Sequence, residues 1–223
     1  MLYLPTVRLV LAMSLDGRIA LSSGGKANIG GKGDREALEK ALSWSDATLM
    51  GSGTLNAHES TCLIHNQKLI NQRGHEKRSS QPISIIVSQK AAFSEDWAFF
   101  KQPISKWILT PNKNHRLIQS GFDRHLIMEE KWTQTLNKIY NEGISKIVLL
   151  GGMKLISSLL LEDRIDELQL TFSPKILAGK YTWTHTAINN LPVQLTQAEA
   201  WKLKDIKDLG ANEVMLSYIR NRF

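Results

Sequence analysis

The chain of 223 residues contains a single cysteine, Cys62. One cysteine excludes an intramolecular disulfide and is typical of proteins in a reducing compartment, so we expect a cytoplasmic location. The longest apolar runs, such as VLAM and IVLL, are far too short to span a bilayer. Pro5 and Arg8 interrupt the apolar stretch at the start, which argues against a signal peptide. We therefore expect no membrane partner.

The motifs of several large enzyme classes are also missing. No G-x-G-x-x-G follows the first apolar run and no G-x-x-x-x-G-K-[ST] is present, so neither an ordinary Rossmann NAD site nor a P-loop is supported. No G-x-S-x-G is present, which argues against a Ser/His/Asp hydrolase. The histidines lack metal-ligand spacing and there is no cysteine pair, so the sequence predicts no metal.

Positive charge is in excess, with 28 basic against 21 acidic residues and a net charge of +7. Such a balance suits nucleic acid, and equally a phosphorylated small molecule or cofactor. The densest basic group has no interleaved aromatic residues, which a surface for single-stranded nucleic acid would need. We interpret it as a solvated loop and expect a small-molecule partner, with no nucleic acid. That group comprises Lys68, Arg73, Lys77 and Arg78.

Hydrophobic patterning alternates between short apolar runs, which predict strands, and segments of helical spacing. Strands are predicted over residues 7–13, 47–50, 83–87, 106–109, 125–128, 147–150 and 165–172. Helices are predicted over residues 35–43, with Asp34 as N-cap, and over residues 132–140 and 153–161. Residues 57–81 are predicted to form an irregular, polar excursion. Residues 200–207 and 213–218 predict an antiparallel hairpin. The order predicts a single α/β domain over residues 1–223, with a mainly parallel sheet and an antiparallel C-terminal edge.

Glycines gather where predicted strands end and helices begin. GSGT follows the strand over residues 47–50, LGGMK includes the end of the strand over 147–150, and SSGGKANIGGKGD precedes the first helix. Ligands collect outside the carboxyl ends of parallel strands, and a helix start there attracts anions. A glycine pair is also an ordinary tight turn, so both interpretations stay open. Asp16, in SLDG, fits a proton donor or ligand as well as a plain turn.

Three stretches together resemble a known family. LAMSLDGRIA, SDATLMGSGTL and VLLGGMKLISSLLLEDRIDELQLTFSPKILAGK are similar, in order and spacing, to the reductase domain of bacterial riboflavin-biosynthesis enzymes. That domain has the dihydrofolate-reductase-like fold, with three layers α/β/α. The resemblance implies a homodimeric NADPH-dependent oxidoreductase that passes a hydride to the ribosyl carbon of 5-amino-6-(5-phosphoribosylamino)uracil, giving the ribityl product.

The resemblance also implies where the cofactor binds. Residues 51–54 would lie near it, and residues 151–154 would receive its pyrophosphate at a helix start. Residues 29–31 would close over the nicotinamide, with Asn28 where the family has Trp. Thr110 and Asn112 would lie at the adenosine end. The implied cofactor-binding residues are Ala12, Ile29, Gly30, Gly51, Ser52, Gly53, Thr54, Thr110, Gly151, Gly152, Met153 and Lys154.

Departures from the family pattern fall on the substrate side. Val10 stands where the family has lysine, and Leu150 stands where it has the glutamate that would bond the pyrimidine. His58 stands where the family has aspartate, and His65 lies near the position of the family's arginine. A site built to pair a polar heterocycle rejects it strongly when the pairing groups are lost. Three functions stay open: the pyrimidine reductase with altered contacts, an NADPH reductase for a pterin or other carbonyl or imine, and a non-catalytic relative that binds a nucleotide or a partner.

Overall fold

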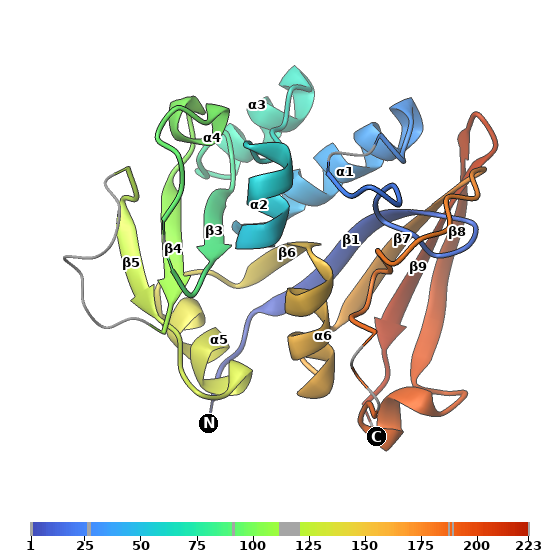
Figure 1. Ribbon diagram of the computed structural model, residues 1–223. Coiled ribbons are helices and arrows are strands. Elements are labelled where there is room, and N and C mark those ends of the chain that lie inside the picture. The colour runs from blue at the N-terminus through green and yellow to red at the C-terminus, as the bar shows by residue number, and fades with distance from the viewer. Residues whose placement is uncertain are drawn as a thin grey trace. The chain divides into compact units, whose positions relative to one another are not determined.

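The computed structural model describes residues 2–25, 28–90, 92–111, 121–186, 188 and 190–222 (Figure 1). The chain divides into two compact units, Met1–Pro5 with Glu39–Val148 and Thr6–Leu38 with Leu149–Phe223. Helix α1 (Lys32–Trp44) and strand β6 (Lys146–Gly151) each begin in one unit and end in the other. That residues 1–223 act as a single domain stays a prediction.

The first unit is built on parallel strands. These run in the order β5-β4-β3-β2, with every neighbouring pair parallel, and β5, β4 and β3 lie side by side in Figure 1. Leu49, Ile85 and Ile108 on three of these strands are fully buried, as expected for continuous apolar runs in a parallel sheet. The elements of this unit are β2 (Ala47–Gly51), α2 (Ser52–His58), α3 (Gln67–His75), β3 (Ile83–Val87), α4 (Ala98–Lys101), β4 (Lys106–Thr110), β5 (Arg124–Ile127) and α5 (Trp132–Asn141).

The second unit carries the antiparallel hairpin. Its strands run in the order β1-β7-β9-β8, in which β1 and β7 are parallel and the β7–β9 and β8–β9 pairs are antiparallel. The hairpin turn places Ala211 and Asn212 at φ values of 52° and 63°, which matches the twist of the two strands. The elements are β1 (Thr6–Ser14), α6 (Met153–Leu161), β7 (Glu167–Ser173), the short helix η2 (Val193–Thr196), β8 (Trp201–Gly210) and β9 (Glu213–Arg220).

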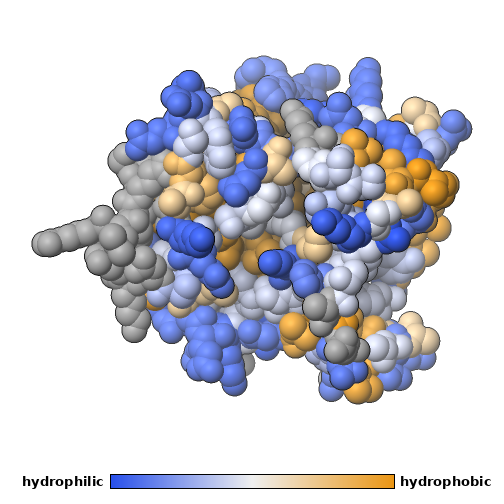
Figure 2. Space-filling view, in the orientation of Figure 1, coloured by the Kyte–Doolittle hydropathy of each residue, from blue (hydrophilic) through white to orange (hydrophobic). Residues whose placement is uncertain are grey.

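These strands confirm the predicted α/β class, with mainly parallel strands and an antiparallel C-terminal hairpin. The expectation of an irregular excursion over residues 57–81 is wrong in part, because α2 extends to His58 and α3 occupies Gln67–His75. No helix in the described part of the chain is long and apolar enough to cross a bilayer. Apolar side chains also reach the surface (Figure 2), and in the second unit Leu203, Ile206 and Ile219 are 45%, 61% and 37% exposed.

The start of α1 is satisfied from far along the chain. The helix begins at Lys32, so the prediction of Asp34 as its N-cap is wrong, and Asp34 lies in the first turn. The Gly31 carbonyl accepts from the Arg35 N–H at 3.1 Å, and the Gly31 N–H donates to Glu213 Oε1 at 2.8 Å. Because β9 supplies this acceptor, the helix starts earlier than its own sequence indicates.

Asp34 lies beside that acceptor in an unfavourable setting for a charge. Burial raises the pKa of its carboxyl, a hydrogen bond with Thr171 lowers it, and the nearby Glu213 carboxylate raises it, so that the net shift is upward. Glu213 is only 4% exposed, and its Oε2 has no hydrogen-bond partner among the described residues. Two carboxyls are therefore held close together at the start of α1.

The end of α1 is capped by arginines. Arg73 is 1% exposed, so its predicted place on a solvated loop is wrong. Its Nη1 donates to the carbonyls of Leu42, Ser43 and Ser45 at 3.3, 3.0 and 2.7 Å, and burial lowers its pKa to about 10, which leaves it charged at neutral pH. Arg78 donates to the carbonyls of Ser43, Trp44 and Ser45 and forms an ion pair with Asp46 at 3.1 Å. A buried cation is stabilised here by the negative end of the helix.

We expect Arg73→Met to lower the free energy of unfolding by about 3 kcal/mol, because several buried carbonyls lose their donor at once. Urea denaturation measures the change. The matched control is Lys68→Met on the same helix α3, where the side chain is exposed and the expected change stays within about 0.5 kcal/mol. Equal midpoints for the two variants would show that the arginine is not a cap.

Asp34→Asn replaces the strained carboxyl by a neutral group of the same shape. Because the folded state raises the pKa of Asp34, it binds a proton more tightly than the unfolded state, and the free energy of unfolding falls as the pH rises above about 4. We expect the variant to be more stable than the wild type near pH 8, with the difference vanishing below about pH 4. Urea denaturation across pH tests this, with exposed Asp205→Asn as control; a difference independent of pH would contradict it.

Candidate functional site

In the first unit, GSGT forms the passage from β2 to α2. Gly51 ends β2 and precedes α2 in extended conformation, and no side chain caps the start of that helix. Ser52 and Thr54 are half-buried and Gly53 is exposed. A Cβ added at Gly53 would meet nothing within 4 Å, so packing within the protein does not require glycine there and the space beside it is open.

In the second unit, LGGMK forms the passage from β6 to α6, which follows the strand directly in Figure 1. Gly151 has a φ of 97°, in the region that favours glycine, and the Gly151–Gly152 peptide is cis. Gly152 precedes α6 without any side-chain cap, while Met153 is half-buried and Lys154 is exposed in the first turn. An uncapped helix start with a lysine in its first turn has the chemistry of an anion site.

The two apolar departures lie on strands of the second unit. Val10 is 7% exposed on β1 and pairs in register with Gln169 of β7, and Ala12 is half-buried opposite Thr171. Leu150 is half-buried at the end of β6, directly before Gly151. Neither Val10 nor Leu150 can donate or accept a hydrogen bond through its side chain. If these two positions face the substrate, as the resemblance implies, their side chains offer it no hydrogen-bonding group.

Asp16 is held as a carboxylate in a turn. It accepts hydrogen bonds from Ser14 Oγ at 2.5 Å and from the backbone N–H groups of Leu177 and Ala178 at 3.1 and 2.8 Å. The Ser14 hydroxyl first, and then the Leu177 N–H, hold the pKa of Asp16 well below its usual value, at about 2. A group so acidic is ionised at neutral pH and is a poor proton donor. Of the two interpretations that the sequence leaves open for Asp16, these contacts favour the plain turn over the proton donor.

The segment over residues 28–31 is fixed from outside. Ile29 is 6% exposed, and Lys175 Nζ donates to the carbonyls of Asn28 and Ile29 at 2.8 and 2.9 Å. A Cβ at Gly30 would lie 2.0 Å from Asp34 Oδ2, so only glycine fits there. Sequence reasoning missed Lys175 and Glu213, because the partners are 146 to 182 residues apart and no local signal links them.

The segment after α2 is also fixed, by side chains within the first unit. His58 ends α2 and its carbonyl accepts from Ser60 Oγ, while His65 is exposed and its backbone N–H donates to Glu39 Oε2 at 2.9 Å. Gln102 bonds both the N–H and the carbonyl of Thr61, and Gln81 does the same for Ile64. The sequence gives no local sign that Glu39, Gln81 and Gln102 hydrogen-bond the backbone of this segment.

Of the two residues predicted at the adenosine end, the structure describes only Thr110. Thr110 is the last residue of β4 and is fully buried, with Oγ1 at 3.5 Å from the Gln89 carbonyl. Asn112 lies outside the described residues. In the part of the chain that the structure covers, no three His, Cys, Asp or Glu side chains lie close enough to hold a metal ion.

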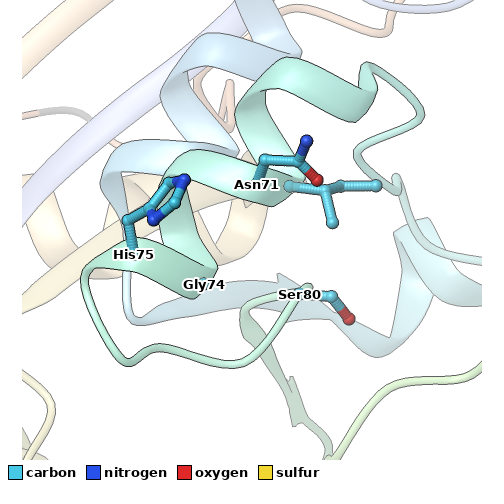
Figure 3. Close-up of a pocket in the computed structure, with 5 residues that line it drawn as sticks. Asn71, Gly74, His75 and Ser80 are labelled. Carbon is cyan, nitrogen blue, oxygen red and sulfur yellow. The ribbon is translucent and has the colours of Figure 1, made fainter.

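A surface hollow lies in the first unit, away from the predicted residues in sequence. Figure 3 shows Asn71 and His75 projecting from α3, with Ser80 in the segment that follows, and Ile70 and Gly74 complete the lining. The labelled side chains are exposed and none of the residues predicted to bind the cofactor or substrate lines this hollow. It is therefore not the candidate site.

Comparisons with known proteins agree with this fold. The chain is 23% identical over 184 residues to the 2,5-diamino-6-ribosylamino-4(3H)-pyrimidinone 5′-phosphate reductase of Archaeoglobus fulgidus, covering 79% of this chain and 83% of that one. It is 24% identical to riboflavin biosynthesis protein RibD of Haemophilus influenzae over 96% of this chain, but spans only 58% of that longer protein.

Solved structures give the same architecture. A pyrimidine reductase-like protein from Corynebacterium diphtheriae superposes with a TM-score of 0.82 at 19% identity, covering 98% of this chain and 93% of that one. Dihydrofolate reductase from Enterococcus faecalis superposes with a TM-score of 0.53 at 14% identity over the full length of both chains. The profile of the RibD C-terminal domain matches residues 5–209. The chain therefore belongs to the RibD C-terminal domain family.

Proposed function

We propose that the chain is an NADPH-dependent reductase of riboflavin biosynthesis that acts on a phosphoribosylamino-pyrimidine. The observation that carries the proposal is the uncapped start of α6 behind Gly151–Gly152, with exposed Lys154 in its first turn. Free backbone N–H groups, the helix dipole and a lysine together suit a dinucleotide pyrophosphate. A second proposed contact of the cofactor is the passage from β2 to α2, where Gly53 is exposed and an added Cβ would meet nothing within 4 Å.

In this proposal the chain's own residues bind and orient, and NADPH, when bound, supplies the hydride. Lys154 and the backbone of residues 151–154 hold the pyrophosphate, and residues 51–54 contact the cofactor through their backbone. Residues 28–31 cover the nicotinamide, where buried Ile29 excludes water. Ala12 and Thr110 are the remaining cofactor contacts of the proposal. Asp16 takes no part in proton transfer, because it is ionised and fully engaged as an acceptor.

The substrate part of the proposal follows the relatives' names. The Archaeoglobus fulgidus protein is a reductase of a ribosylaminopyrimidinone 5′-phosphate, and we propose a substrate of that class here. A second candidate, a reductase for a less polar carbonyl or imine, or for a pterin, is favoured by apolar Val10 and Leu150 on the substrate side. His58 and His65 are the proposed replacements for the family's aspartate and arginine on the substrate side.

Assembly and location are further parts of the proposal. We propose a homodimer, and the exposed Leu203, Ile206 and Ile219 on β8 and β9 provide apolar surface for one. A single domain is proposed because α1 and β6 run through both compact units, so neither unit can unfold without breaking a shared element. A cytoplasmic location follows from the proposed pathway.

NADPH is expected to raise the melting temperature. A ligand that binds only the folded state at 100 times its Kd adds about 2.7 kcal/mol, which for a chain of this size shifts Tm by roughly 5 to 10 °C. Lys154→Met is expected to weaken NADPH binding by about tenfold, whereas the control Lys202→Met on exposed β8 leaves it unchanged. Differential scanning fluorimetry with an NADPH titration checks both. No shift at millimolar NADPH would support the non-catalytic alternative.

Val10→Lys with Leu150→Glu restores the family's polar pair. If the proposed pocket is right, the double variant oxidises NADPH faster with the phosphoribosylamino-pyrimidinedione than the wild type does, by at least tenfold in kcat/KM, because paired polar groups again match the heterocycle. Absorbance at 340 nm measures the rate, and each single variant serves as a control for a buried unpaired charge. A folded double variant with unchanged kcat/KM on this substrate would show that these positions do not contact it.

A further inference from the structure

The segment over residues 28–31 is held between two opposite charges. Lys175 Nζ donates to the carbonyls of Asn28 and Ile29, and Glu213 Oε1 accepts from the N–H of Gly31 at 2.8 Å. Lys175 thus donates to two carbonyls of the segment and Glu213 accepts from one of its N–H groups. We call these two side chains together the clamp. Hydrogen bonds that involve a charged partner are about twice as strong as neutral ones.

The lysine that forms one half of this clamp is itself fixed. The Lys175 carbonyl accepts from the Leu15 N–H at 2.9 Å. The N–H groups of Leu177 and Ala178, two and three residues later, donate to Asp16. The loop over residues 174–179 therefore ties the SLDG turn to the segment over residues 28–31. The carboxylate of Asp16 is one of the groups that hold the loop carrying Lys175.

The glutamate half is fixed by burial. Glu213 is 4% exposed on β9, and a Cβ added at Gly31 would lie 3.0 Å from its Oε2. Gly33, in the first turn of α1, approaches so closely that an added Cβ would lie 2.1 Å from the Leu209 carbonyl of β8. The glycines of GGKGD thus let the segment and the helix start press directly against the hairpin.

We propose that Lys175 and Glu213 are positioning residues that hold residues 28–31 in a preformed shape to receive the reactive ring of the cofactor. The inference rests on the proposed function, since NADPH is the ligand that the segment would cover. A preformed segment binds more tightly because the entropy of ordering it has been lost during folding. Neither side chain needs to touch the cofactor, because both act through the backbone of the segment.

Glu213→Met tests the clamp against Glu213→Gln. Methionine keeps the length of the side chain but offers the Gly31 N–H only its thioether sulfur, a weak acceptor, whereas the glutamine amide oxygen is a full acceptor. We expect the Gly31 amide to exchange its hydrogen about tenfold faster in the methionine variant, without any cofactor, and to stay near the wild-type rate in the glutamine variant. Hydrogen exchange followed by NMR measures both rates.

The same variants decide what the clamp is for. We expect NADPH to bind about tenfold more weakly to Glu213→Met and to Lys175→Met than to the wild type, with Glu213→Gln and the exposed-surface control Lys202→Met near the wild type, as measured by titration calorimetry. Faster Gly31 exchange with unchanged NADPH affinity would overturn the inference while leaving the proposed function intact. A wild type that binds no NADPH would overturn the proposed function, and Gly31 exchange would still report whether the clamp exists.

Discussion

The backbone groups at the two ends of α1 impose the constraint on which much of this structure depends. A helix leaves its first N–H groups and last carbonyls without internal partners, and these must be satisfied when they are buried. At the start, the Gly31 N–H finds Glu213, and at the end, three carbonyls find buried Arg73. Each compact unit caps the end of α1 that it contains. The signs are those that the helix dipole favours.

The same principle recurs along the segments that carry the candidate site. Asp16 takes two backbone N–H groups of the loop after β7, Glu39 takes those of His65 and Asn66, and two glutamines pair with the backbone on either side of Cys62. Irregular segments here are thus ordered by side chains as well as by their own turns. Such segments can present backbone groups to a ligand without a large ordering cost at the moment of binding.

The contrast between predicted and missed features follows from how far each signal reaches. Parallel strands such as β3 were predicted within a residue because a continuous aliphatic run needs no distant partner to be recognised. Helix α2 was missed because SGTLNAH has poor helix propensity, and α3 because its buried residue is an arginine. The Asp34 cap was wrong for a related reason: the acceptor that starts α1 comes from a residue 182 positions later.

The site divides along the same line. The glycines at strand ends could be recognised locally, because what each one does depends on its own position and on no distant partner. Gly151 adopts a positive φ, and Gly53 leaves open space beside the backbone. Lys175 and Glu213 could not, because a lysine in a loop and a glutamate in a strand carry no sign of what they bond. If the cofactor side depends on such distant partners, it resists change, as any substitution there disturbs several backbone groups at once. The side chains of Val10 and Leu150 make no hydrogen bonds, so if these positions face the substrate as proposed, substrate recognition can diverge without disturbing the backbone hydrogen bonds of the proposed cofactor side.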